Sequence, residues 1–396
     1  MTTRQISQKR RGLISKRVNR LSPSGIRKFF DLLASMEGVI SLGVGEPDYV
    51  TPWHICEAAI RSLEKGYTMY TSNFGMLELR EELSRHFKEN YGVAYDPAEE
   101  LLVTVGVSES LDLAMRAILN PGDEVIMPDP CYVAYEAAVI LAGGEPVRIP
   151  TFQKNNFEIS AADVEARVTA NTRAILIGYP ANPTGAVMSR DKLLRIAEVV
   201  ERHRLTVVSD EIYAKLVYGV EHTCFAALPG MKERAIFLGG FSKAYAMTGW
   251  RVGYAAATRD VIAAMTKIHQ YTIMSAPTMA QVAAIEALKS GEKDAQEMAA
   301  DYNRRRLFIV DGLNSIGLPC FEPRGAFYTF PSIKATGMTS EEFSEKLLVE
   351  EKVAVVPGSA FGQCGEGYVR CCYATSIEDI EKALTRMKRF VQKHKK

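Results

Sequence analysis

Apolar positions in the middle of the chain follow two spacings in turn, and this alternation predicts strands and helices in a repeated order. Short apolar runs bounded by glycine, proline or aspartate are typical of buried strands, whereas apolar residues three and four positions apart are typical of helices. The runs that predict strands are 101–106, 124–127, 146–149, 174–178, 206–209, 235–238 and 252–256. Residues 108–119 and 189–204 have the spacing of amphipathic helices. We therefore predict an α/β fold with a mostly parallel seven-stranded sheet and helices on both faces.

The pattern changes toward the carboxyl end. Residues 296–316 and a stretch that starts at Ile377 are helix-like, and short apolar runs at 326–330 and 353–356 indicate strands. With 396 residues, of which 47% are hydrophobic, the chain exceeds the size at which a single core usually splits. We predict an arm and part of a small domain in residues 1–48, a large domain in 49–295 and a small α+β domain in 296–396.

Charge and cysteine content exclude several classes of function. The net charge of +1 gives no broad electrostatic reason to bind nucleic acid or a membrane surface, and no apolar run approaches the ~18 residues of a membrane span. The seven cysteines form no C-x-x-C pair and no two histidines stand at zinc-ligand spacing, which predicts reduced thiols and no metal site. Residues 1–20 are basic but lack the apolar core of a secretory signal, so we expect a cytoplasmic protein.

One segment, FSKAYAMTGWRVGY at residues 241–254, carries the strongest chemical signal. Lys243 ends an apolar run, and Arg251 follows eight residues later. A lysine held near an arginine suits a residue that binds a cofactor covalently beside the cofactor's phosphate group. The segment therefore predicts pyridoxal 5'-phosphate, with Ser242 and Arg251 as phosphate donors.

Other predicted strands end in side chains that suit the same cofactor. Asp210 leads into SDEIY, in the place where α/β proteins put ligand groups, and is the candidate partner of a pyridinium nitrogen. Asn182, in the turn NPTG, and Tyr213 are candidates to reach the cofactor's phenolate oxygen. The segment GVSES at 106–110 follows a strand and opens a helix, so its free backbone N–H groups favour a phosphate, although an ordinary capped helix start is the alternative. Its candidate residues are Val107, Ser108 and Glu109.

In this order and at these distances, NPTG, SDEIY, SK and GWRVGY resemble the class I and II aminotransferases of the fold-type I pyridoxal-phosphate enzymes. Matching segments run from Ile14 in ISKRVNRLSPS to Arg370 in YVRCCYA, so the resemblance covers nearly all of the chain. It implies the fold of those enzymes and an aminotransferase that moves an amino group from an L-amino acid to a 2-oxo acid. The mechanism implied is ping-pong.

The resemblance also implies roles for individual residues. Lys243 first binds the cofactor and then acts as the base at the substrate Cα, while Asp210 keeps the ring nitrogen protonated. Tyr213 completes the predicted catalytic set. Arg370 lies in an apolar strand pattern, where a carboxylate is its natural partner, and in the family pattern it binds the substrate α-carboxylate. The predicted substrate contacts are Gly45, Asn182 and Arg370.

Several further positions follow from the family pattern. Tyr132 stands where the family stacks an aromatic ring on the pyridine. Tyr70 matches a tyrosine that reaches the neighbouring subunit's phosphate, and residues 275–277 resemble a cross-subunit segment, so a homodimer with composite sites is implied. The chain departs from the pattern at Gly240, where relatives often carry a serine whose hydroxyl binds the phosphate.

Three alternative functions share part of this pattern. A carbon–sulfur β-lyase or an aminocyclopropane-carboxylate synthase would use nearly the same residues, because the cofactor supplies the chemistry. A regulator with a DNA-binding helix-turn-helix module would need more than the roughly forty residues that precede Gly43. A nicotinamide dehydrogenase would need G-x-G-x-x-G, and Asp48 stands where the third glycine belongs.

Charge near the site bears on the choice of substrate. A dicarboxylic substrate needs a second cation beyond Arg370, and residues 271–275 contain none. The loop position that carries a lysine in some relatives is Ser108, so only the arm is left to supply a cation. We expect a neutral donor, aromatic or aliphatic, with 2-oxoglutarate as acceptor. The arm cations are Lys16, Arg17 and Arg20, and the candidate wall residues are Tyr70, Tyr132, Tyr271 and Phe327.

Overall fold

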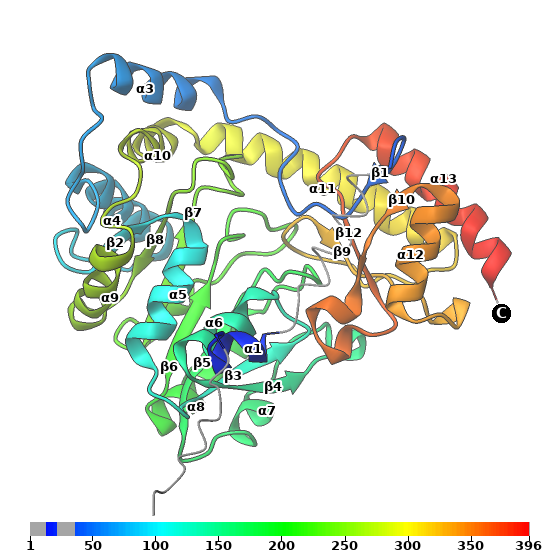
Figure 1. Cartoon of the computed structure of the whole chain (residues 1–396), viewed down its shortest axis with the longest axis horizontal. Helices are drawn as coiled ribbons and strands as arrows, with labels where there is room; N and C mark the ends of the chain where they lie inside the picture. The colour runs from blue at the N-terminus through cyan, green and yellow to red at the C-terminus, as the bar shows by residue number, and fades with distance from the viewer. Residues whose placement is uncertain (1–12, 22–35, 396) are drawn as a thin grey trace, which may run out of the picture.

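The computed structural model describes residues 13–21 and 36–395. Seven strands form the main sheet in the order β2-β8-β7-β6-β5-β3-β4 (Figure 1). β8 is antiparallel to β2 and β7, and the other neighbouring pairs are parallel. This arrangement confirms the predicted mostly parallel seven-stranded sheet. The strands are β2 (Leu101–Thr104), β3 (Glu124–Asp129), β4 (Glu145–Pro150), β5 (Thr172–Ile177), β6 (Thr206–Asp210), β7 (Ala235–Gly240) and β8 (Gly253–Ala256).

Helices cover both faces of this sheet. The helices of the described residues are α1 (Lys16–Arg20), α3 (Trp53–Glu64), α4 (Leu77–Tyr91), α5 (Gly106–Ile118), α6 (Ala134–Ala142), α7 (Ala161–Glu165), α8 (Arg190–His203), α9 (Arg259–Thr272), α10 (Thr278–Ser290), α11 (Glu292–Ser315), α12 (Ser340–Glu351) and α13 (Ile377–His394). Ala174 and Leu176 of β5 pack with α5, α6 and α9, whereas Ile175 and Ile177 pack with α4, α8 and α10. Alternate side chains of one strand therefore serve two separate cores, which explains why the strand is apolar throughout.

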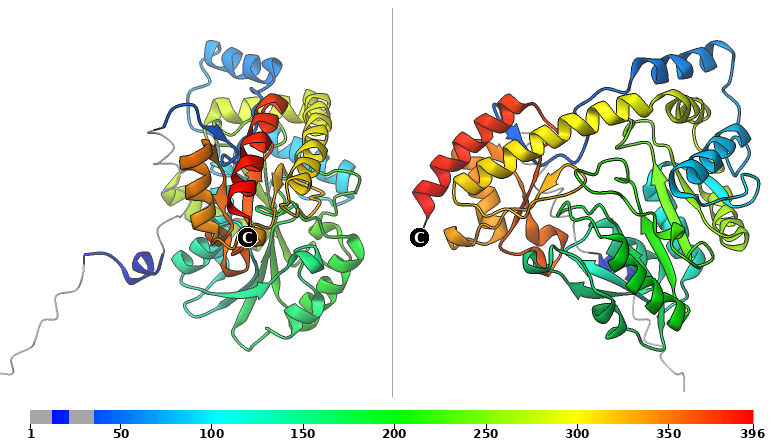
Figure 2. Two further views of the ribbon diagram at one scale, coloured as in Figure 1. Left: turned by 90° about the vertical axis from the view of Figure 1, so that its right-hand side faces the viewer. Right: turned by 180° about the vertical axis from the view of Figure 1, so that it is seen from behind.

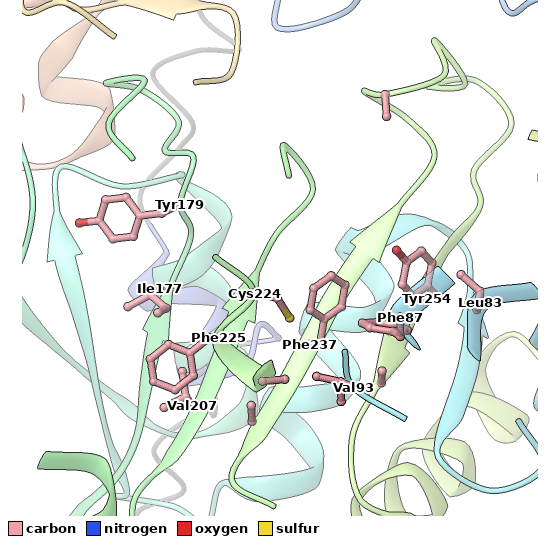
Figure 3. Packing of buried hydrophobic residues seen from close by; sticks show 14 of the residues in the cluster. Leu83, Phe87, Val93, Ile177, Tyr179, Val207, Cys224, Phe225, Phe237 and Tyr254 are labelled. Atoms are coloured by element: carbon pink, nitrogen blue, oxygen red, sulfur yellow. The ribbon is translucent and has the colours of Figure 1, made fainter. Parts of the chain in front are cut away.

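Aromatic rings fill the core between the sheet and α4. Phe87 of α4 lies edge-on to Phe237 of β7, with ring centres 4.9 Å apart, and Phe237 stacks on Tyr254 of β8 (Figure 3). Rings in these arrangements add specific attraction to the large apolar area that they remove from water. The packing fixes β7 against β8, and the connection between these two strands carries Lys243.

A second group of elements lies at the carboxyl end of the chain. α11 runs continuously from α10 to this group, where it packs with α13 (Figure 1). The predicted boundary between residues 295 and 296 falls inside α11, and the division into domains stays a prediction. The strands here are β1 (Ile40–Ser41), β9 (Tyr328–Thr329), β10 (Val353–Ala354), β11 (Val356–Pro357) and β12 (Val369–Cys372). Since β1 pairs with β10, the segment near residue 40 joins the carboxyl-terminal elements.

Two predicted strands of this group are shorter in the structure. The run 326–330 forms only β9, because Ala326 takes a left-handed backbone conformation with φ 57° that a strand does not accept. The run 353–356 divides into β10, which pairs with β1, and β11, which pairs with β12. One apolar run thus serves two small sheets.

The described part of the amino-terminal arm lies against α6. Arg20 forms a bidentate ion pair with Glu145, with N–O distances of 2.9 and 2.6 Å. Arg17 donates a hydrogen bond to the carbonyl oxygen of Leu141. These two cations are therefore engaged by the end of α6 and the start of β4. Residues 1–12 and 22–35 of the predicted arm lie outside the described residues.

The described residues carry neither a membrane helix nor a metal cluster. No helix among residues 13–21 and 36–395 has the length and apolar character needed to cross a membrane. Within the same ranges, no group of three or more His, Cys, Asp and Glu side chains is arranged so that it could hold a metal ion.

Candidate active site

The carboxyl ends of β5, β6 and β7 open into a cavity of about 470 Å³, which is where α/β sheets bind ligands. Most of the residues predicted from sequence line it. Those residues are Gly45, Val107, Ser108, Tyr132, Asn182, Asp210, Tyr213, Ser242, Lys243, Arg251 and Arg370. The cavity is also lined by residues that the motifs did not single out. Those residues are Leu111, Val133, Tyr135, Pro180, Ile212, Thr248 and Tyr328.

Lys243 follows β7 and points its amine at a backbone carbonyl. Its Nζ donates to the carbonyl oxygen of Gly45 at 2.7 Å, and the ring centre of Phe327 lies 5.7 Å from Nζ. Burial lowers the pKa of Lys243 to about 8, because an ammonium loses hydration in this position. The uncharged amine, the form that a nucleophile or base requires, is therefore far more abundant near neutral pH than for an ordinary lysine.

Asp210 is the last residue of β6, and its carboxylate is buried. The Tyr135 hydroxyl donates to Oδ2 at 2.8 Å and the Ile212 backbone N–H donates to Oδ1 at 3.2 Å. Burial nevertheless raises the pKa of Asp210 to about 6. A cation placed beside this carboxylate would compensate for the lost hydration by its charge and favour the ionised form of Asp210. Sequence reasoning missed Tyr135, because its contact joins the start of α6 to a distant strand.

Arg370 lies on β12 and is only 4% exposed. Its Nη1 donates to Asn182 Oδ1 at 2.9 Å and its Nη2 donates to the Gly43 carbonyl oxygen at 2.7 Å. The buried Nε has no hydrogen-bond partner. No described carboxylate forms an ion pair with this guanidinium, and a buried charge without a counter-charge is costly. The site therefore has an unmet requirement for an anion.

The start of α5 and Arg251 form a second place for an anion. Gly106 has φ 74°, and a Cβ at this position would lie 2.6 Å from Arg251 Nη2, so only glycine lets the guanidinium approach the helix start. Free N–H groups and the helix dipole favour a phosphate here. Ser242 lines the same cavity and is buried. Arg251 also donates to the carbonyl oxygen of Thr248 at 3.0 Å.

Packing explains the absence of a serine at Gly240. A Cβ at Gly240 would lie 3.0 Å from Val107 Cγ2 and 3.2 Å from Ile212 Cδ1. Both contacts are tighter than ordinary van der Waals packing, so the Val107 and Ile212 side chains would have to shift by a few tenths of an ångström to admit a Cβ at this position.

Two predicted cofactor contacts do not line the cavity of this chain. The Glu109 carboxylate accepts from the Val105 N–H at 2.5 Å and contacts His269 Nδ1 at 2.7 Å, so it supports the start of α5 from behind. Tyr70 is 81% exposed. Among the candidate wall residues Tyr132 lines the cavity, whereas Tyr271 is 87% exposed and Phe327 is completely buried.

The loop between β1 and α3 connects the site to α11. Arg305 of α11 pairs with Asp48 at 2.7 Å and with Asp301 at 2.6 Å, and it is largely buried between these two acids. Thr51 donates to the carbonyl oxygen of Ala246 at 2.7 Å. These bonds fix the loop carbonyls that Lys243 and Arg370 use.

The fold and this set of side chains define a transaminase, and comparison with known proteins agrees. The model of the family "Aminotransferase class I and II" matches residues 37–387, so the chain belongs to the class I and II aminotransferases. Its activity is the pyridoxal-phosphate-dependent transfer of an amino group between an amino acid and a 2-oxo acid.

Individual relatives match almost end to end. YugH of Bacillus subtilis strain 168, which is named provisionally as an aminotransferase, is 59% identical over 96% of this chain and 98% of its own length. Aromatic-amino-acid aminotransferase 2 of Thermococcus litoralis is 46% identical, covering 96% of this chain and 99% of that protein. The crystal structure of the aromatic aminotransferase of Pyrococcus horikoshii OT3 shares 46% identity, covers 92% of this chain and 99% of that one, and has a TM-score of 0.89.

The chemistry of the cavity fits pyridoxal 5'-phosphate. The buried Lys243 amine suits an aldehyde, and the Asp210 carboxylate suits a protonated ring nitrogen. The start of α5 and Arg251 suit a phosphate. Arg370 remains available for the carboxylate of an amino acid.

We predict that Asp210→Asn stabilises the cofactor-free protein at pH 7.5. The folded-state pKa of about 6 lies above the ordinary value of 3.8, so ionised Asp210 destabilises the fold above pH 6, and this cost disappears as the pH falls toward 3.8. By linkage the gain is about 3 kcal/mol at pH 7.5 and about half of that at pH 5. Urea unfolding at both pH values measures it. Exposed Asp311→Asn serves as the control, and a variant less stable than wild type at pH 7.5 contradicts the prediction.

Proposed function

We propose that this aminotransferase prefers a neutral L-amino acid donor, aromatic or aliphatic, over aspartate. The observation that carries the proposal is the supply of cations. Among the described residues that line the cavity, only Lys243, Arg251 and Arg370 are cationic, and each has a role in binding the cofactor or the α-carboxylate. A side-chain carboxylate would then lack a counter-charge. Relatives at equal identity of 46% include both an aromatic and an aspartate aminotransferase, so similarity alone does not decide.

Arg370 binds the α-carboxylate of the donor in this proposal. The carboxylate supplies the counter-charge that the buried guanidinium lacks, and the unpaired Nε supplies a donor for it. Asn182 and the Gly43 carbonyl hold the guanidinium in place. The carbonyl of Gly45 positions Lys243 beside the same part of the cavity.

Lys243 takes the proton from the substrate Cα, and its lowered pKa makes the amine available as a base. When bound, pyridoxal phosphate supplies the electron sink that stabilises the charge left at Cα. Asp210 would keep the ring nitrogen of the bound cofactor protonated, and Tyr213 and Asn182 would donate to its phenolate oxygen. Tyr132 would hold the ring from the cavity wall. The residues that would hold the cofactor's phosphate are Val107, Ser108, Glu109 through its backbone, Ser242, Arg251 and, from a second subunit, Tyr70.

A homodimer with composite sites completes the proposal. Apolar side chains of α3 and of the loop before it, of the loop before α4 and of the end of α9 are exposed, and exposed apolar surface is typical of a protein interface. The most exposed of them are Val50, Trp53, Met69, Tyr70 and Tyr271. Figure 2 shows α3 at the outside of the molecule, beyond α10. The cytoplasmic location stays a prediction. 2-oxoglutarate as acceptor also stays a prediction, because Arg20, one of the arm cations that could pair with its second carboxylate, is engaged by Glu145.

Lys243→Ala is expected to lower the rate of amino transfer by about 10⁴-fold, because the base at Cα is lost. The variant should still retain bound cofactor after gel filtration, because the residues that contact the phosphate are unchanged. Lys293→Ala, at an exposed position, is the matched control. Turnover of the Lys243 variant near the wild-type rate would contradict the assignment of the catalytic lysine.

The donor preference is tested by measuring kcat/KM for phenylalanine, tyrosine, alanine, methionine and aspartate with one 2-oxo acid. We expect aspartate to be at least about tenfold worse than the best neutral donor, a difference of ~1.4 kcal/mol. A tenfold preference for aspartate refutes the substrate proposal and leaves the aminotransferase class intact. Release of pyruvate and ammonia from a β-substituted donor would reveal lyase chemistry.

Mixed dimers test whether Tyr70 acts across subunits. Lys243→Ala and Tyr70→Ala chains are each expected to form impaired dimers. If Tyr70 serves the partner's site, a mixed dimer contains one site with both native residues, and mixing restores activity. If Tyr70 serves its own chain, no mixed site is native and mixing restores nothing. Sedimentation at the assay concentration checks that dimers are present, and an active monomer contradicts the proposal.

A further inference from the structure

Tyr328 contacts both halves of the cavity, although no motif pointed to it. It lies on β9 beside β12, the strand of Arg370, and it is 1% exposed. Its hydroxyl oxygen is 2.8 Å from the Tyr213 hydroxyl oxygen. The Arg370 guanidinium carbon is 4.4 Å from the centre of its ring. One side chain therefore touches the group assigned to the cofactor and the group assigned to the substrate.

The hydroxyl of Tyr328 is confined by the loop before α3. A Cβ at Gly45 would lie 2.4 Å from the Tyr328 hydroxyl oxygen, so glycine is needed for this oxygen to sit where it does. The carbonyl of Gly45 accepts the hydrogen bond from Lys243. The ring packs against Tyr213 and Phe327, with centres 5.9 and 4.9 Å away. Little room is left for either group to take another position.

We propose that Tyr328 is a positioning residue with two separable actions: its hydroxyl orients Tyr213, and its ring holds Arg370. The inference rests on the roles proposed above for Tyr213 and Arg370. Once Tyr213 donates its proton to an acceptor in the cavity, its oxygen accepts from Tyr328, and hydrogen bonds in such a chain strengthen one another. The ring covers one face of the guanidinium, where it replaces hydration, and leaves the N–H groups at the guanidinium's edge for acceptors.

The hydroxyl is tested with Tyr328→Phe, which keeps the ring. In the cofactor-loaded enzyme, the pH midpoint of the cofactor absorption band should rise by about 0.5–1 unit. Without the Tyr328 hydroxyl, Tyr213 is a weaker hydrogen-bond donor, so it stabilises the phenolate oxygen of the cofactor less. Tyr218→Phe is the matched control, since it removes another buried hydroxyl of the same core that bonds the Ala326 carbonyl away from the cavity. A midpoint equal to that of the control overturns the hydroxyl's action.

The ring is tested with the affinity for 3-phenylpropionate, a carboxylate without an amino group. Tyr328→Phe should bind it within about twofold of wild type, whereas Tyr328→Leu should bind it about tenfold more weakly, because only leucine removes the aromatic face under Arg370. Should the leucine variant not fold, Tyr328→Met provides the same test with an unbranched side chain. Wild-type affinity in a folded leucine or methionine variant overturns the ring's action.

Two further variants separate this inference from the proposed function. Arg370→Leu should abolish binding of 3-phenylpropionate, and Tyr213→Phe should shift the absorption midpoint in the same direction as Tyr328→Phe. If these two variants behave like wild type, the assigned roles of Arg370 and Tyr213 fail, and the inference fails with them. If they respond and the Tyr328 variants do not, only the inference fails.

Discussion

Burial of charged groups beside neutral partners is the constraint on which this site depends. Lys243 meets a backbone carbonyl, Asp210 meets a hydroxyl and an amide, and Arg370 meets an amide and a carbonyl. Each arrangement supplies hydrogen bonds but no direct ion pair, so the pKa of Lys243 falls and that of Asp210 rises. The charges that these groups lack are those of a phosphopyridine and an amino acid. The buried groups of the protein therefore select a ligand by the charges that their own hydrogen bonds do not balance.

Other parts of the structure offset the free energy that burial of these charged groups costs. Two apolar cores hold the strands whose ends bear Asp210 and Lys243, and Arg305 fixes the loop that supplies the carbonyls. Stability at Arg305 comes from complete charge pairing, since two acids meet one buried guanidinium. Arg370 differs from Arg305 in that no described carboxylate pairs with it. Arg305 therefore has a structural role, and Arg370 is suited to bind an anionic ligand. Fold and site thus place the same residue type under opposite electrostatic conditions.

Sequence patterns predicted the main sheet and most of the cavity, because both depend on local signals. Buried strands appear as bounded apolar runs. Asp210 follows such a run directly, and Asn182 and Lys243 lie within about five residues of the end of one. Tyr135 and Tyr328 were missed because their roles come from contacts between segments distant in the chain. The short strands near the carboxyl end were overextended, since their limits depend on a left-handed residue and on a change of sheet rather than on hydrophobicity.

The antiparallel pairing of β7 with β8 has a consequence for how the enzyme is made. Lys243 and Arg251 lie in the single connection between these strands, whereas Arg370 comes much later in the chain. Closing a short loop loses less chain entropy than joining distant segments, so the hairpin assembles locally. During synthesis it also leaves the ribosome before β12 exists. The half of the site that holds the cofactor can therefore take shape on the growing chain before the half that selects the substrate.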